Sequence, residues 1–145
     1  MISNPKCGWC KFKLNDFVGN ASYLTNVPLE LLEAFVNFWN NSSALAVHFD
    51  EEGTEFTLVI NPNSIFIIVE RDEKPELIYI ENYVENLTLE LIKDIEADFD
   101  GWVNFITSDD EEDTAEQRQV LIVNLIELKE IVKRKRIRYI EPKSE

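Results

Sequence analysis

The sequence predicts one α+β domain, in which a mostly antiparallel β-meander carries about three helices packed on one face. Apolar and polar residues alternate through much of the first 80 positions, and short connections between these stretches indicate antiparallel strands. Apolar residues three and four apart, after Pro28 and again after Thr88, indicate helices. The chain has 145 residues, 45% of them hydrophobic, which suffices for the core of one domain. No linker divides it, so residues 1–145 are expected to form a single domain.

Two short strands and a helix come first. Trp9, Lys11 and Lys13 alternate with apolar neighbours, which predicts a strand over residues 9–14. Residues 17–24 are expected to add a second strand, with Gly19-Asn20 as its kink or turn. A helix is predicted to begin near Pro28, whose missing N–H suits a first helical turn, and to end at the polar residues 40–43. Its apolar face consists of Leu31, Leu32, Phe35, Phe38 and Trp39.

Four strands of a meander are expected next, over residues 45–49, 55–60, 64–70 and 77–80. Turn residues separate them, including a hairpin turn with Gly53 at its end and a second turn with Pro62 at its second position. The nearly continuous apolar run from Ser64 to Glu70 is typical of a central strand that is buried on both faces.

Helices are predicted for the last third of the chain. Residues 88–106 have one apolar face, and Gly101 is expected to bend or end this helix. An acidic connection over residues 108–113 precedes a final helix from about Thr114 to Lys135, which ends in basic residues as the helix dipole favours. Residues 137–140 could form a short final strand.

The charge of the chain is segregated along the sequence. Between Phe49 and Glu116 there are 21 acidic and three basic residues, whereas the whole chain has a net charge of −14. A field of one sign attracts basic partners and repels nucleic acid, whose phosphates are also negative. The sequence therefore predicts a basic protein partner and no direct contact with nucleic acid. The alternative is that the acidity serves solubility alone.

Apolar segments of the chain are too short for a membrane span of about 18 residues or more. Residues 1–10 also lack the apolar region of a secretory signal. We therefore expect a cytoplasmic protein.

The motif Cys7-Gly8-Trp9-Cys10 leaves three interpretations open. Two thiols at this spacing can form a redox dithiol, but that motif usually begins a helix, whereas here it leads into a predicted strand. They can also supply two of four zinc ligands, but His48 is the only histidine that could join them. The third interpretation is one buried cysteine and one without a role, so Cys7 and Cys10 are weak metal candidates.

No catalytic motif accompanies His48, which is expected on an outward strand face. Carboxylate pairs such as Asp94 and Asp98 are too numerous to indicate a metal or an acid–base couple. The basic cluster over residues 133–138 fits a helix end better than a nucleic-acid site, because the acidic remainder opposes phosphate. We therefore expect a non-enzymatic protein without a cofactor.

Two segments carry a family resemblance. Residues 9–39 and the motif D-G-W-V-N-F-I at residues 100–106 resemble the immunity proteins of bacterial polymorphic toxin systems. Residues 27–38 are also similar to the L-P…F helix of the SMI1/KNR4-like immunity superfamily, although Asn40-Asn41-Ser42-Ser43 stands where that superfamily has Gly-Gly.

The resemblance implies an antitoxin that neutralises a basic, nuclease-like toxin domain by occluding it. An acidic inhibitor is steered quickly to a cleft that holds phosphates, although apolar anchors are still needed for affinity. The other function in view is a general interaction or regulatory domain, which could be a homodimer. The candidate partner-binding residues are the acidic groups Asp50, Glu51, Glu52, Glu55, Asp109, Asp110, Glu111, Glu112 and Asp113.

Overall fold

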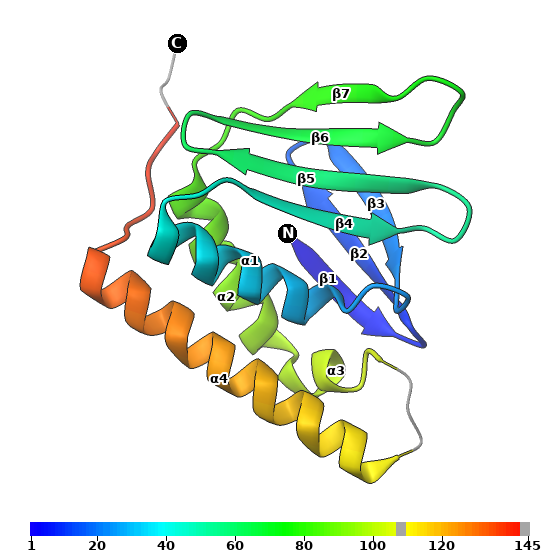
Figure 1. Cartoon of the computed structure of the whole chain (residues 1–145), viewed down its shortest axis with the longest axis vertical. Coiled ribbons are helices and arrows are strands. Elements are labelled where there is room, and N and C mark those ends of the chain that lie inside the picture. The colour runs from blue at the N-terminus through cyan, green and yellow to red at the C-terminus, as the bar shows by residue number, and fades with distance from the viewer. Residues whose placement is uncertain (107–109, 143–145) are drawn as a thin grey trace.

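The computed structural model describes residues 1–106 and 110–142, and it confirms the α+β class (Figure 1). The strands form two antiparallel sheets rather than the single sheet expected from the sequence. The elements in chain order are β1 (Ile2–Lys6), β2 (Trp9–Leu14), β3 (Phe17–Ser22), α1 (Val27–Asn41), β4 (Leu45–Asp50), β5 (Glu55–Asn61), β6 (Ser64–Glu70), β7 (Glu76–Tyr79), α2 (Val84–Ala97), α3 (Phe99–Val103) and α4 (Glu111–Lys135).

The first sheet is a three-stranded meander with the order β1-β2-β3. Its strand β1 was not predicted, because it contains Pro5 and only one apolar residue, Ile2. Proline is tolerated there because β1 is an edge strand, and the pairing with β2 is irregular between Ser3 and Lys6. Cys7 and Gly8 form the tight turn between these strands, both with positive φ, as primed hairpin turns require.

The second sheet is the predicted meander, with the strand order β4-β5-β6-β7. The β4–β5 turn has Glu52 and Gly53 at its centre, again both with positive φ. Asp50 pairs with Glu55 across this turn, so the register of the hairpin is set there.

Aromatic side chains join the two sheets in a common core. Phe12 and Phe17 of the first sheet meet Phe49 and Phe56 of the second, with ring centroids 4.7–6.1 Å apart within this group. Gly19 lies in the middle of β3, where a Cβ atom would come within 2.4 Å of the Phe56 ring. The sequence-based assignment of Gly19-Asn20 to a kink or turn is therefore wrong, because the glycine allows the sheets to approach closely.

The sequence predicted helices packed together on one sheet face. In the structure they lie in layers. Helix α1 packs against β4, and α2 and α3 pack against β1. Helix α4 packs against these three helices, on the side of the molecule away from the four-stranded sheet (Figure 1). A pair of amide hydrogen bonds, 3.0 and 3.1 Å long, joins Gln117 of α4 to Asn26 at the start of α1.

The last third of the chain differs from the prediction in several places. Helix α2 begins at Val84 rather than Thr88, and Gly101, which was expected to bend or end the helix, lies inside α3. The expected helix over residues 88–106 is two helices, because the side chain of Asp98 accepts a hydrogen bond from Gly101 N–H and caps α3. Helix α4 begins three residues earlier than expected, after the cap Asp110. Residues 137–140 form no strand, and Ile140 is instead held by the side chain of Asn86.

Candidate partner-binding surface

The four-stranded sheet has one buried face and one face that is partly open to solvent. In β5, Phe56, Leu58 and Ile60 are fully buried, whereas the side chains between them are only half-buried. The same alternation holds in β6, so the prediction that this strand is buried on both faces is wrong. Its apolar residues Phe66 and Ile68 belong to the outward face.

Cross-strand pairing arranges the outward side chains in rows. The first row crosses all four strands and consists of Ala46, Val59, Phe66 and Tyr79. The second row consists of His48, Thr57, Ile68 and Leu77. Leu77 is 47% exposed and Tyr79 is 73% exposed, and the Tyr79 ring lies 6.1 Å from that of Phe66. The centre of the open face is therefore mainly apolar. This surface was not predicted from the sequence, although the apolar run of β6 indicated apolar side chains on both faces of that strand.

A third row on the same face is acidic. Asp50 is paired with Glu55, and Glu55 with Glu70, so three carboxylates from neighbouring strands lie side by side. Like charges directly opposite each other in a sheet destabilise the pairing. The imidazole of His48 lies beside this row, with its Nε2 3.4 Å from Glu55 Oε2. Asp50 and Glu55 were predicted as contact residues from the sequence, whereas Glu70 was not.

The turn beside this row adds one exposed carboxylate. The N–H of Glu52 donates a 2.6 Å hydrogen bond to Asp50 Oδ1, which fixes the turn. The side chain of Glu52 is exposed beyond the acidic row. We name Asp50, Glu52, Glu55 and Glu70 the acidic edge, and Val59, Phe66, Ile68, Leu77 and Tyr79 the apolar face.

Glu51 faces the other way and serves the fold. Its carboxylate accepts hydrogen bonds of 3.0 and 2.8 Å from Arg71, one of 3.0 Å from the Thr54 hydroxyl and one of 3.3 Å from Asn20 N–H. Burial alone would raise the pKa of Glu51, but these hydrogen bonds and the charge of Arg71 outweigh it and lower that pKa. Arg71 also donates to the carbonyl of Val18, so the pair ties the two sheets together. Glu51 is therefore not included in the acidic edge.

The second predicted acidic group lies at the start of α4, apart from the first in Figure 1. Asp109 lies outside the described residues. Asp110 caps the helix by accepting a 2.8 Å hydrogen bond from Glu112 N–H. Glu111, Glu112 and Asp113 occupy the first turn, where negative charge interacts favourably with the helix dipole. These acids stabilise a helix, whereas those of the acidic edge weaken a sheet.

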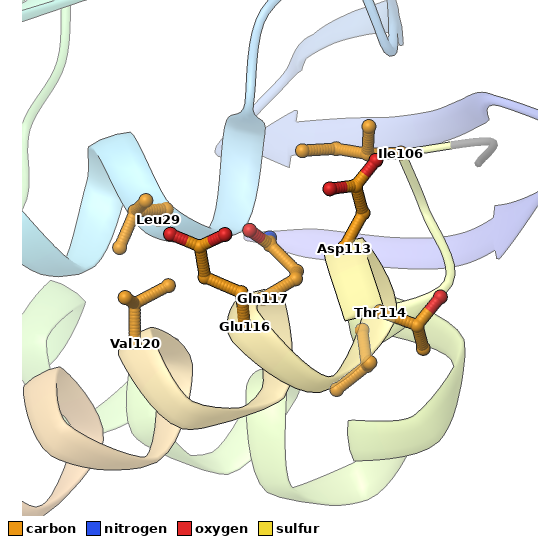
Figure 2. Close-up of a pocket in the computed structure, with 8 residues that line it drawn as sticks. Leu29, Ile106, Asp113, Thr114, Glu116, Gln117 and Val120 are labelled. Atoms are coloured by element: carbon orange, nitrogen blue, oxygen red, sulfur yellow. The ribbon is translucent and has the colours of Figure 1, made fainter. Parts of the chain in front are cut away.

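A pocket of about 300 Å³ lies beside this helix start (Figure 2). Leu29 and Val120 provide apolar walls, and Asp113 and Glu116 bring carboxylates to it. Its other polar side chains bond within the chain, as Gln117 does to Asn26. The pocket thus offers no nucleophile paired with a base among its described lining residues, and nothing in it indicates a reaction.

The cysteine motif is divided between the surface and the core. Cys7 is exposed in the β1–β2 turn, whereas Cys10 is buried in β2. Burial raises the pKa of the Cys10 thiol to about 12, although a hydrogen bond with the backbone of Ala21 opposes this. A thiol with such a pKa is a poor nucleophile at neutral pH. Among the described residues, no group of three or more histidine, cysteine, aspartate or glutamate side chains is placed to hold a metal ion.

Neither the described helices nor comparisons with known proteins point to a function. Over the described residues, no helix combines the length and apolar character needed to cross a membrane. Comparisons with protein-family models, with curated proteins and with solved structures found no match.

Proposed function

We propose that this protein is a non-enzymatic binding protein that occludes a basic protein partner with the apolar face and acidic edge of its four-stranded sheet. The observation that carries the proposal is the acidic edge itself. Three carboxylates opposed across neighbouring strands cost stability, unlike the acids that begin α4. A cost of this kind is offset when a cationic partner lies against the row.

The two parts of the surface would act on different steps of binding. Complementary charge mainly raises the rate of association, and it does so less in high salt. Apolar side chains such as Leu77 and Tyr79 would slow dissociation, because anchors that are buried in the complex supply most of the affinity. A nucleic acid would bind this surface poorly, because the carboxylates of the acidic edge would repel its phosphates.

The class of protein that fits this surface is an immunity protein, or antitoxin, for a basic, nuclease-like toxin domain. This assignment agrees with the resemblance carried by residues 9–39 and 100–106. It places the protein in the cytoplasm, where it would protect the cell that makes it. Blocking a phosphate-binding cleft requires a complementary acidic surface and apolar anchors beside it, so no cofactor or catalytic group is needed.

The test is a set of parallel pull-downs from lysate of the source cells, at low and high salt, with mass spectrometry of the bound proteins. The baits are the unchanged protein, the neutralised edge D50N/E55Q/E70Q and the altered face L77S/Y79S. The unchanged protein should retain a basic domain that salt releases, and both variants should lose it. The captured domain, expressed alone, should arrest growth, and co-expression of this protein should restore growth.

A matched control removes the same number of charges at the other acidic group, in the variant E111Q/E112Q/D113N. This bait should bind as well as the unchanged protein. If the control loses the partner while the edge and face variants keep it, our contact surface is wrong. A captured domain that arrests growth equally with and without this protein would exclude the antitoxin function.

One observation favours the alternative of a general interaction or regulatory domain. Several acids have a structural use, as Glu51 does between the sheets and Asp110 does at the start of α4. On that view the remaining acidity would serve solubility. It predicts that the edge variant D50N/E55Q/E70Q changes neither the captured proteins nor their release by salt.

A further inference from the structure

Helix α4 carries apolar side chains on its solvent face as well as on its buried face. Leu121, Leu125 and Leu128 pack into the core, whereas Val123 and Ile126 on the opposite side are 51% and 56% exposed. The exposed pair lies near the middle of the 25-residue helix. A helix that is apolar on two opposite faces is usually covered on both.

The solvent face of α4 has the spacing of a helix–helix seam. One stripe along it contains residues at alternating spacings of three and four, namely Glu116, Gln119, Val123, Ile126, Glu130 and Lys133. This is the spacing by which helices pack side by side. The stripe has an apolar centre, an acid at each side of it (Glu116 and Glu130) and a base, Lys133, at its end.

The charges at the two ends of this stripe are complementary to each other when the helix is reversed, whereas Glu130 then faces the uncharged Gln119 of the other copy. Along the helix axis, Glu116 and Lys133 each lie about 13 Å from the point midway between Val123 and Ile126, because an α-helix rises by about 1.5 Å per residue. Two copies of α4 packed antiparallel about that point would place Glu116 of each against Lys133 of the other. Within residues 1–106 and 110–142, neither of these two side chains forms an ion pair.

We propose that the protein forms a symmetric homodimer through antiparallel packing of α4 on α4 of a second copy. The contact is isologous, because the same stripe serves both partners. The net charge of −14 opposes association, but α4 lies on the side away from the four-stranded sheet (Figure 1). The dimer therefore keeps the two acidic edges on its outer sides. This proposal does not rest on the proposed function.

Charge reversal provides a sharp test by sedimentation velocity and native mass spectrometry. In a dimer of Glu116→Lys, two lysines meet at each end of the seam, and in a dimer of Lys133→Glu two glutamates meet. Each variant alone should dimerise roughly tenfold more weakly than the unchanged protein. An equimolar mixture should form heterodimers in excess of the statistical share, because both ends then pair opposite charges. The double variant E116K/K133E should recover the original affinity.

Matched controls lie on the exposed β6–β7 turn, where Glu73→Lys and Lys74→Glu make the same changes of net charge. Mixing these two variants should give only the statistical share of heterodimers. The variant V123S/I126S should be monomeric, with an unchanged circular dichroism spectrum. A monomer of the unchanged protein at all concentrations would overturn the proposal. So would a mixture of Glu116→Lys and Lys133→Glu that behaves like the control mixture.

Discussion

Neighbouring glutamates of the β4–β5 turn have opposite roles, which their surroundings decide. Glu51 is held by four hydrogen bonds from Arg71, Thr54 and Asn20, whereas the side chain of Glu52 is exposed. We expect Glu51→Gln to lower the free energy of unfolding by about 1–3 kcal/mol at neutral pH, because the charge-assisted bonds with Arg71 are lost and the bond from Asn20 N–H of the other sheet is weakened. Glu52→Gln is the matched control and should change stability by less than about 0.5 kcal/mol. Urea unfolding measures both.

The effect of Glu51 should depend on pH in a definite direction. Its pKa in the folded protein lies below the usual value of 4.5, so its contribution to stability is complete above that value. The contribution is lost as the pH falls through the lowered pKa and the carboxylate is protonated. The stabilities of the unchanged protein and of Glu51→Gln should therefore converge in acid. A difference that stays constant down to the acid transition would contradict this account.

The two cysteines should differ in reactivity as they differ in burial. The pKa of about 12 leaves almost no thiolate on Cys10 at neutral pH, and the folded chain covers its sulfur. We expect a thiol reagent to modify one cysteine rapidly in the native protein and both after unfolding. Cys7→Ser should abolish the rapid reaction. Rapid modification of both cysteines in the native protein would revive the redox interpretation of the motif.

Among the elements, β3 shows most directly how one residue fixes a packing distance. A methyl group on Gly19 would lie 2.4 Å from Phe56 Cε1, and Phe56 is stacked on Phe49 at 4.7 Å and cannot yield freely. We expect Gly19→Ala to destabilise the protein by about 1–3 kcal/mol through overpacking. This outweighs the gain of about 0.4–1 kcal/mol that a less flexible unfolded chain provides.

Asn20→Ala is the control for this substitution, because Asn20 points outward from the same strand. It should alter the urea midpoint little. A Gly19→Ala variant as stable as the unchanged protein would mean that the two sheets can separate without loss, contrary to the packing of their phenylalanines.

Elements with a strong local pattern could be predicted from the sequence, and those set by distant contacts could not. The alternation in β4 and β5 and the helical spacing of α1 were sufficient for their assignment. Strand β1 has no such pattern, because its place at an edge depends on pairing with β2. The break between α2 and α3 likewise follows from the cap formed by Asp98, which the apolar spacing does not reveal.

At the scale of the molecule, the acidity of the chain could be read from the sequence, but the arrangement of its acidic and apolar side chains on the surface could not. The excess of acids between Phe49 and Glu116 is visible in the sequence, whereas the alignment of Asp50, Glu55 and Glu70 depends on the register of three strands. The apolar face could not be predicted from the sequence for a related reason. A strand with apolar residues at every position has the same sequence pattern whether its second face is covered by another layer or open to a partner.

The net charge predicts how the whole molecule responds to salt. With 28 acidic and 14 basic residues, the folded chain repels itself, and salt screens that repulsion. Salt also weakens ion pairs, but the pairs Arg118–Asp100 and Lys129–Glu96 are exposed and each contributes at most about 1 kcal/mol. We therefore expect Tm to rise by a few degrees between low and high sodium chloride, since about 1 kcal/mol corresponds to roughly 2–8 °C. Calorimetry at one low protein concentration measures this, and the monomeric variant V123S/I126S separates it from any change in dimerisation. If the Tm of that variant falls with salt, the ion pairs stabilise the fold by more than the self-repulsion destabilises it. The acidic side chains would then be compensated by nearby basic side chains to a greater extent than the net charge implies.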